Sequence, residues 1–426
     1  MTLDKKAFDG WGARLAAVAG RVAAESPGER PERQPVHTVY GGANLFRYDT
    51  AAKLGRLATA TLDEFAPDAD TLAEALGIAD ADLAGRVHAR VAEKLGTEPV
   101  EDFRLDYEDG YGNRPDDEED ADADAGAGQL TAGMKAGTLP PFTGIRIKPL
   151  SGELHGRALR TLDIFVTTLA ETNGALPPGF CVTLPKIQDP EQVAVLDEAL
   201  SRLEDRLGLD PIALELMMET PQMVVDRDGR AGLRHYIAPA GDRIRGIHFG
   251  TYDYTASMSV TAAHQSMTHP ACDFARHVMQ VSAAGTGIWL SDGATNVMPV
   301  GDRDSVHAAW RLHFDHVRSS LVHGFYQGWD LHPAQLPSRY AAVYSFFMEG
   351  LDQAGERLSN FVDQAAKATL VGDVFDDAAT GQGLLNYFLR AINCGAITEQ
   401  EAIDRTSLTL AELHTRSFLR ILEGRR

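Results

Sequence analysis

Two segments decide the fold: Ile212-Ala-Leu-Glu-Leu-Met-Met218-Glu219 and Ile244-Arg-Gly-Ile-His-Phe249-Gly-Thr-Tyr-Asp253. Short apolar runs that are closed by turn residues are typical of buried parallel strands. Each run is followed by an acid just beyond its end, Glu219 in the first and Asp253 in the second. In parallel barrels the chemistry lies at the carboxyl ends of the strands. We therefore treat these two acids as candidates for one site.

Paired carboxylates at neighbouring strand ends suit a hard divalent cation, most simply Mg²⁺, with Mn²⁺ as its substitute. The alternative is that each acid caps the helix that follows it, a common role for an acid in this position. For one acid alone the capping role is the simpler interpretation. The occurrence of both acids, together with further polar strand ends, favours the metal.

The composition is that of a globular protein without a membrane span. The chain has 426 residues, of which 44% are hydrophobic and 24% are charged, values that are ordinary for a soluble domain with accessories. The formal net charge of −21 argues against binding to nucleic acid or to an anionic membrane. An anionic substrate would then need a local cation, either a metal ion or an arginine.

The cysteines and the chain start indicate a cytoplasmic protein. Cys181, Cys272 and Cys394 are far apart and odd in number, which fits a reducing compartment and argues against a disulfide framework or a zinc cluster. The opening Met1-Thr-Leu-Asp-Lys-Lys lacks the apolar core of a signal peptide. No apolar stretch approaches the length that spans a bilayer.

Eight short apolar runs alternate with helical segments, a pattern that predicts a (β/α)₈ barrel. The predicted strands are residues 36–40, 102–106, 143–148, 180–186, 212–218, 244–249, 287–293 and 328–333. The predicted helices include 50–66, 70–95, 156–172, 190–207, 273–284 and 303–323. We expect an N-terminal helical accessory over 1–35, a catalytic barrel over 36–340 and a C-terminal helical extension over 341–426. The acidic tract Asp116–Gly128 is expected to be a mobile loop.

The usual nucleotide and hydrolase motifs are absent from the sequence. Tyr40-Gly-Gly-Ala-Asn after the first strand does not match the dinucleotide fingerprint. There is also no Gly-x-x-x-x-Gly-Lys-Ser/Thr loop, no His-Glu-x-x-His and no Gly-x-Ser-x-Gly elbow. An open nucleotide-binding sheet is therefore the weaker alternative to the barrel.

Other polar residues also stand at predicted strand ends. Arg146 interrupts an apolar alternation, so it either extends to the rim or binds an anion. Lys186 follows Pro185 at the same rim and serves as a carboxylate, phosphate or structural cation, with Schiff-base chemistry as the less favoured role. The proton carrier stays open among Asp292, His248 and His332. For His248 the alternative is a core histidine, and for His332 a structural turn.

The strand ends, taken in order, resemble the HpcH/HpaI aldolase and citrate lyase β-subunit superfamily, which also includes malyl-CoA lyases and, more distantly, malate synthases. The matching pieces span about residues 36–340: Leu105-Asp106-Tyr-Glu108-Asp109-Gly110, Ile145-Arg146-Ile-Lys, Leu184-Pro185-Lys186, Met218-Glu219-Thr220, Phe249-Gly250-Thr-Tyr-Asp253-Tyr, Ser291-Asp292-Gly293 and Leu331-His332-Pro333-Ala-Gln335. Each piece alone is weak, but seven in family order are specific. The first strand lacks the Val-Pro-Gly-like anchor of the family, so the chain resembles a divergent branch and the use of coenzyme A stays open.

The resemblance implies a Mg²⁺-dependent enzyme that makes or breaks a C–C bond beside a carbonyl. It implies Glu219 and Asp253 as metal ligands and Arg146 as the partner of the substrate carboxylate or enolate. Gly250 and Thr251 are the further expected substrate contacts. Glu108 and Asp109 are candidates for ordering metal-bound water. Arg146, Lys186, Asp292 and His332 form the expected catalytic set.

The sequence therefore predicts a metal-dependent lyase or aldolase that acts on a 2-oxo acid or hydroxy acid, or on its coenzyme A thioester, through a metal-stabilised enolate. The first alternative is a barrel of the same superfamily that handles phosphoenolpyruvate or pyruvate. The second is a non-catalytic barrel that acts by association. The resemblance also implies a homo-oligomer, whereas the net charge is what argues against nucleic acid or a membrane as a partner.

Overall fold

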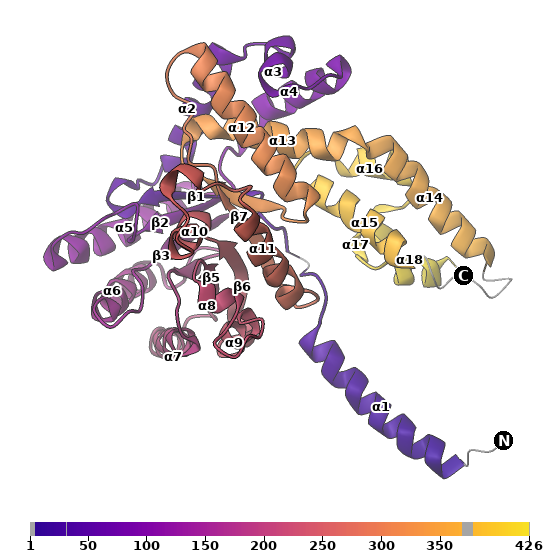
Figure 1. Cartoon of the computed structure of the whole chain (residues 1–426), viewed down its shortest axis with the longest axis horizontal. Coiled ribbons are helices and arrows are strands. Elements are labelled where there is room, and N and C mark those ends of the chain that lie inside the picture. Colours follow the sequence, from indigo (N-terminus) through magenta and orange to yellow (C-terminus); the bar gives the residue numbers. More distant parts are fainter. Residues whose placement is uncertain (1–4, 31, 369–377, 426) are drawn as a thin grey trace. The chain divides into compact units, whose positions relative to one another are not determined.

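The computed structural model describes residues 5–30, 32–368 and 378–425, and within them the strands form a closed barrel in the order β1-β2-β3-β4-β5-β6-β7-β8. The registered pairs, β8–β1, β1–β2, β4–β5, β5–β6 and β6–β7, are all parallel. The predicted (β/α)₈ barrel is therefore confirmed (Figure 1). The strands are β1 His37–Gly42, β2 Asp102–Asp106, β3 Phe142–Arg146, β4 Cys181–Leu184, β5 Ala213–Met218, β6 Ile244–Phe249, β7 Trp289–Ala294 and β8 Gln327–Asp330.

Helices follow the strands and continue beyond the barrel. The α-helices are α1 Lys5–Glu25, α2 Thr50–Phe65, α3 Ala69–Leu76, α4 Ala81–Thr97, α5 Asp116–Ala136, α6 His155–Asn173, α7 Pro190–Leu207, α8 Pro221–Val224, α9 Leu233–Ile237, α10 Thr251–Ser257, α11 Pro270–Ala283, α12 Arg303–Val322, α13 Leu336–Glu349, α14 Leu351–Ala368, α15 Ala378–Asn393, α16 Glu399–Thr406, α17 Leu410–His414 and α18 Phe418–Gly424. Short 3₁₀ turns are η1 Ala43–Leu45, η2 Gly241–Arg243, η3 Ala262–His264 and η4 Pro333–Gln335. No helix in the described ranges has both the length and the hydropathy that a membrane span requires.

The chain divides into two compact units. The first unit comprises Met1–Glu32, Arg146–Asp163 and Cys181–Ser291. The second comprises Arg33–Ile145, Ile164–Phe180 and Asp292–Arg426. The candidate metal ligands, Arg146 and Lys186 all belong to the first unit.

In the first unit, β4, β5 and β6 lie side by side with α7, α9 and α11 outside β5 and β6 (Figure 1). Leu184 pairs with Leu216, and Met217 pairs with His248. Successive side chains of a strand point to opposite faces, so alternate residues of β5 bury their side chains against the outer helices and inside the barrel. This register brings the last residues of β5 and β6 to the same edge.

In the second unit, a buried charge cluster joins β8 and β1 to α12 and α13. Asp330 accepts hydrogen bonds from Arg339 Nε at 3.1 Å and from Arg339 Nη2 at 2.9 Å. His37 Nδ1 lies 2.7 Å from Asp330 Oδ2, and His313 Nε2 lies 3.1 Å from Asp330 Oδ1. Burial alone would raise the pKa of Asp330, but Arg339 and the two histidines hold this pKa well below its usual value. The carboxylate therefore stays ionised inside the protein.

The expectation that Asp116–Gly128 is a mobile loop is wrong, because the tract opens the 21-residue helix α5. Its first turn carries Asp116, Asp117, Glu118 and Glu119, and acids at this end interact favourably with the helix dipole. Further along, small residues pack inward: Ala123 is fully buried, and Gly126 lies against Tyr107 and Phe165. The acid-rich composition here marks a helix start rather than disorder.

The single helix expected over 70–95 is two helices, α3 and α4. Gly77 ends α3 in the left-handed conformation with φ +66°, which glycine adopts without a Cβ penalty. Asp80 then caps α4 by accepting hydrogen bonds from the main-chain N–H groups of Asp82 and Leu83. A further short helix, α9, lies between β5 and β6.

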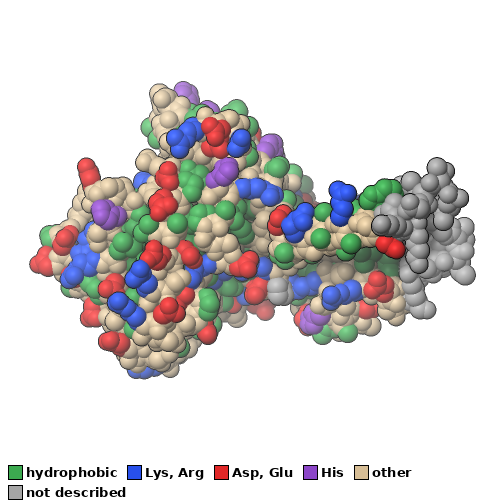
Figure 2. All heavy atoms as spheres, turned by 90° about the horizontal axis from the view of Figure 1, so that it is seen from below, with side chains coloured by type: hydrophobic (Ala, Val, Ile, Leu, Met, Phe, Trp, Pro, Cys, Tyr) green, Lys and Arg blue, Asp and Glu red, His purple; other side chains and the backbone are tan. Residues whose placement is uncertain are grey.

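The expected N-terminal helix exists as α1, but its apolar stripe is not buried against the described chain. The five stripe residues are between 41% and 67% exposed: Phe8, Trp11, Leu15, Val18 and Val22. The predicted N-terminal accessory therefore contains a helix whose apolar side chains are exposed. On the face shown in Figure 2, acidic and basic side chains are interspersed rather than separated.

Candidate metal and substrate site

Glu219 stands immediately after β5, on the face shared with Glu215 and Met217. Its side chain is only 2% exposed, and Oε1 accepts a hydrogen bond from the main-chain N–H of Lys186 at 2.6 Å. The next residue, Thr220, donates its hydroxyl to the carbonyl of Ile187. The ends of β4 and β5 are thus tied together at the carboxylate.

Asp253 lies in the first turn of α10, directly after β6. Its carboxylate is more accessible than that of Glu219, with 42% of the side chain exposed. Oδ2 lies 3.2 Å from Lys186 Nζ. Lys186 therefore contacts both candidate ligands, one through its main chain and the other through its ammonium group.

Gly250 leaves the space that Glu219 occupies. A Cβ atom at this position would lie 2.2 Å from Glu219 Oε2 and 2.4 Å from Glu219 Cβ, much closer than atoms pack in proteins. The main-chain N–H of Gly250 donates to Met218 O at 3.1 Å. The glycine is required by close approach, since its own φ of −90° is open to other residues.

Lys186 has an unusual main-chain conformation, with φ +50°. A residue with a Cβ pays a steric cost in this left-handed region. Such conformations persist where surrounding contacts hold them, and they are found at functional sites. Here the conformation aims the Lys186 N–H at Glu219 while the side chain reaches Asp253.

Arg146 ends β3 and is 5% exposed. Its Nη1 lies 3.7 Å from Met217 Sδ. Because Met217 and Glu219 are two residues apart at the end of β5, their side chains leave the strand on the same face. The guanidinium therefore lies on the face of β5 that carries Glu219.

Below the ends of β5 and β6 lies a layer of buried polar side chains. Sequence reasoning missed this layer. Glu215 accepts from Thr183 Oγ1 at 3.0 Å and from Arg245 Nη2 at 3.3 Å. His248 Nε2 lies 3.5 Å from the same carboxylate, and His248 is 1% exposed. This partner favours the core role for His248. The signal in the sequence was Glu215 itself, an acid inside an apolar run and four residues before Glu219.

The donor set fits Mg²⁺ better than a metal held wholly by protein. Within the described residues, no group of three or more His, Cys, Asp or Glu side chains is arranged to hold an ion. Mg²⁺ is commonly bound by one or two carboxylates, with water and substrate in the other positions. Glu219 and Asp253, one buried and one accessible, match that pattern.

Thr251 and Gly250 were both expected to contact substrate. Thr251 is 1% exposed, and its hydroxyl donates to Met267 Sδ at 3.3 Å. That side chain is therefore engaged inside the protein. Gly250 makes room for Glu219, and the substrate contacts expected of Gly250 and Thr251 stay predictions.

The expected water-ordering acids Glu108 and Asp109 lie in the second unit after β2. Glu108 is buried, whereas Asp109 is exposed. Asp106, which precedes them, accepts from the N–H groups of Glu108 and Gly110 at 3.0 and 2.7 Å. This turn fixes the main chain at the end of β2, and the role proposed for its acids stays a prediction.

Asp292 and His332 also lie in the second unit. Asp292 is 1% exposed, accepts from Ser320 Oγ at 2.6 Å and accepts from the N–H of Gly293 at 2.9 Å. His332 begins η4, and its Nδ1 accepts from the N–H of Ala334 at 3.2 Å. Burial lowers the pKa of His332, so the ring is neutral near pH 7 with its proton on Nε2. The capping bond supports the turn role for His332, and the catalytic roles of both residues stay predictions.

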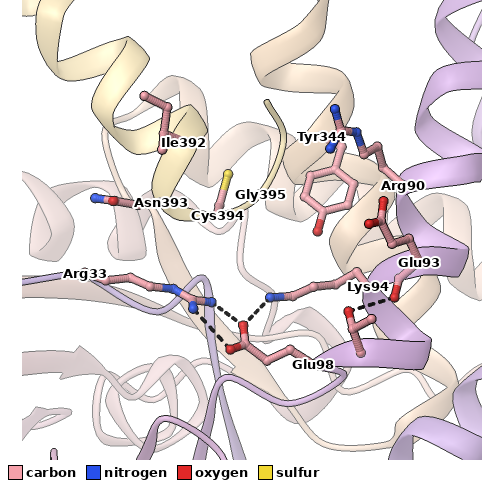
Figure 3. Close-up of a pocket in the computed structure, with 11 residues that line it drawn as sticks. Arg33, Arg90, Glu93, Lys94, Glu98, Tyr344, Ile392, Asn393, Cys394 and Gly395 are labelled. Atoms are coloured by element: carbon pink, nitrogen blue, oxygen red, sulfur yellow. Dashed lines mark hydrogen bonds and ion pairs between the residues drawn. The ribbon is translucent and has the colours of Figure 1, made fainter. Parts of the chain in front are cut away.

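A cavity of about 350 Å³ lies in the second unit between α4 and the end of α15 (Figure 3). Arg33 and Lys94 both contact Glu98, at 2.6 and 2.5 Å, and both also contact the buried Glu101. These ion pairs balance the positive charges of Arg33 and Lys94. Burial raises the pKa of the lining thiol Cys394 to about 12, and the protonated thiol is a poor nucleophile.

Fold and site define the chain as a (β/α)₈-barrel protein with a carboxylate pair at the ends of β5 and β6. It belongs to the family described as Domain of unknown function (DUF6986), whose model matches residues 15–421. A search of curated proteins finds no match.

Solved structures include similar folds from the groups that the sequence motifs resemble. Malate synthase of Haloferax volcanii, in a lead(II) complex, is 16% identical over 91% of this chain and 99% of its own, with a TM-score of 0.47. The citrate lyase beta subunit of M. tuberculosis, complexed with oxaloacetate and magnesium, is 15% identical over 74% and 98%, with a TM-score of 0.44. An HpcH/HpaI aldolase/citrate lyase family protein of Burkholderia cenocepacia is 12% identical over 76% and 95%, with a TM-score of 0.39.

Proposed function

We propose that the chain is a Mg²⁺-dependent carbon–carbon lyase or aldolase that acts on a 2-oxo acid or hydroxy acid. The second substrate is a free carbonyl compound or a coenzyme A thioester. The observation that carries the proposal is the meeting of Glu219 and Asp253 at Lys186, at the ends of three consecutive strands. The choice of C–C chemistry is supported by the seven strand-end motifs that occur in family order.

In this proposal Glu219 and Asp253 hold the ion and fix its place. When bound, the ion supplies Lewis-acid stabilisation of the charge that develops on a keto oxygen. Glu219 is suited to fixing the position, because a main-chain N–H holds one of its oxygens. Asp253 is suited to admitting ion and substrate, because its side chain is partly exposed.

Arg146 binds the carboxylate of the substrate in this proposal. A guanidinium offers parallel N–H donors that match a carboxylate in a bidentate pair. Its position beside Met217, on the face of β5 that carries Glu219, supports this role. Burial of the side chain strengthens the interaction, because water screens the charges less.

Local charge makes an anionic substrate reasonable in a chain of net charge −21. Arg146 and Lys186 balance the two acids in formal charge, so a divalent ion leaves the site positive. A neutral or cationic substrate would gain nothing from this arrangement.

A cytoplasmic location is also part of the proposal, and it is supported by three buried cysteines that remain thiols. The proposal further includes association of the chain with copies of itself.

The first test follows proton exchange in pyruvate and needs no knowledge of the second substrate. The protein is incubated with pyruvate in D₂O with Mg²⁺ or with EDTA, and loss of the methyl proton signal is followed by NMR. We expect exchange that needs Mg²⁺, that Glu219→Gln abolishes and that Glu198→Gln leaves intact. Glu198 is a matched control because its side chain is 64% exposed and forms an ion pair with Arg202 on the surface of α7. Exchange that survives EDTA or Glu219→Gln would reject the metal site.

A further inference from the structure

Lys186 joins two acids that lie 34 residues apart in the sequence. Its main-chain N–H donates to Glu219 Oε1 at 2.6 Å, and its ammonium lies 3.2 Å from Asp253 Oδ2. The Lys186 side chain is 31% exposed, so the ion pair with Asp253 is partly open to solvent. One residue thus has a fixed contact and a movable contact at the same site.

The two contacts differ in what can break them. The contact to Glu219 depends on the main chain, which the left-handed conformation of Lys186 orients. The contact to Asp253 depends on a long side chain with several rotatable bonds, and partly exposed ion pairs of this kind are weak. A stronger cation that binds Asp253 would displace the ammonium and leave the contact to Glu219 intact.

We propose that Lys186 is a displaceable counter-ion of the metal site. Without the metal, its ammonium neutralises Asp253 and holds that carboxylate near the end of β6. When a divalent ion binds Asp253, the ammonium leaves the carboxylate and binds an anionic group of the substrate. The metal then binds first and the keto acid second, and this order rests on the metal site of the proposed function.

Charge fixes the sign of each effect. The ammonium and the metal attract the same carboxylate and repel one another, so the ammonium weakens metal binding. Once displaced, it attracts the substrate anion, so it strengthens substrate binding. If Lys186 merely supported the fold, its replacement would weaken metal binding and substrate binding together.

The test measures binding of Mn²⁺ by calorimetry, followed by binding of oxalate to the Mn²⁺-saturated protein. Oxalate serves as a small dianion that resembles a 2-oxo acid. Lys186→Met removes the charge but keeps a long side chain. It also keeps the steric cost of the left-handed main-chain conformation at residue 186. We expect this variant to bind Mn²⁺ about tenfold more tightly and oxalate about tenfold more weakly, each equal to about 1.4 kcal/mol.

Two further variants separate charge from conformation. Lys186→Gly keeps the N–H to Glu219 and adopts positive φ without strain. We therefore expect it, like Lys186→Met, to bind Mn²⁺ more tightly and oxalate more weakly than the wild type. Lys186→Arg keeps a cation, so its Mn²⁺ affinity should stay near that of the wild type. Thermal unfolding of each variant verifies that the fold is retained.

The outcomes distinguish this inference from the function on which it rests. Unchanged Mn²⁺ affinity in both Lys186→Met and Lys186→Gly, or a loss of both affinities together, overturns the counter-ion role and leaves the metal site standing. Equal Mn²⁺ binding by wild type and Glu219→Gln overturns the metal site itself. Tighter Mn²⁺ binding with weaker oxalate binding supports both.

Discussion

The main-chain N–H of Lys186 lies 2.6 Å from Oε1 of Glu219, so β4 and β5 end at one carboxylate. The Thr220 hydroxyl adds a second tie to the carbonyl of Ile187. A main-chain N–H, which a strand end fixes in place, therefore holds one oxygen of Glu219. A site built this way is preorganised before any ion arrives, which reduces the ordering cost of binding.

Gly250→Ala should disturb Glu219 without straining the main chain. The added methyl group would lie 2.2 Å from Glu219 Oε2, so the carboxylate must move. We expect a loss of about 1–3 kcal/mol in the free energy of unfolding and at least tenfold weaker Mn²⁺ binding, measured by urea titration and calorimetry. Gly152→Ala is the control, because no neighbouring atom lies within 4 Å of a Cβ added at that position. Equal effects of the two substitutions would contradict the packing role of Gly250.

Arg146→Lys should keep the charge but lose the bidentate geometry. A lysine ammonium acts as a point charge and cannot present two parallel donors to a carboxylate. We expect at least tenfold weaker oxalate binding, with Mn²⁺ affinity within about twofold of wild type, a difference below about 0.5 kcal/mol. Calorimetry of Mn²⁺ binding, and then of oxalate binding to the Mn²⁺-saturated protein, measures both. An unchanged oxalate affinity would remove Arg146 from the substrate site.

The buried histidine His313 should make stability fall with acidity. Burial lowers the pKa of His313 below its ordinary value of 6.5, although Asp330 opposes that change. The unfolded chain therefore takes up a proton at a higher pH than the folded chain does. The contribution of neutral His313 to stability is present above about pH 7 and declines as the pH falls below 6.5.

Urea unfolding at pH 7.5 and at pH 5.5 measures this effect. The decrease in the free energy of unfolding between the two conditions should be smaller in His313→Gln than in the wild type. His155→Gln, at an exposed position, should retain the wild-type decrease. If His313→Gln also retains it, the acid sensitivity has another source.

Removal of residues 1–24 should leave the fold intact. Every described side chain of α1 is exposed, so its loss should change the free energy of unfolding by less than about 0.5 kcal/mol. Arg30→Ala should cost about 1–3 kcal/mol, because Arg30 donates to the carbonyls of Gly287 at 3.0 Å and Ile244 at 2.9 Å. Thermal and urea unfolding of both variants measure the contrast. A truncation that costs as much as Arg30→Ala would show that α1 packs against the protein.

The strands were predictable because burial and length constrain them together. Ile212–Met218 and Ile244–Phe249 are apolar, short and closed by turn residues, and they form β5 and β6 within one residue of those bounds. The helix over 190–207 was predicted at its observed bounds, since Pro190 marks its start and leucines line one face; the Asp189 cap appears only in the structure. α5 was missed because an acidic, alanine-rich tract has the composition of disorder as well as that of a charged helix start.

The contacts of the site were less predictable than its residues. Glu219 and Asp253 could be named from their places after apolar runs. Nothing in Leu184-Pro185-Lys186 shows that Lys186 adopts a positive φ and touches both acids. The need for glycine at position 250 likewise depends on the approach of a neighbouring strand, which only the folded structure reveals.

The central claim, that Glu219 and Asp253 jointly hold a divalent ion, is tested most directly by anomalous diffraction from crystals soaked in Mn²⁺. We predict one strong peak at the ends of β5 and β6, about 2.1 Å from an oxygen of each carboxylate, and no such peak in crystals of Glu219→Gln. A wild-type crystal with no peak there, or with an ion bound to only one of the two acids, would contradict it.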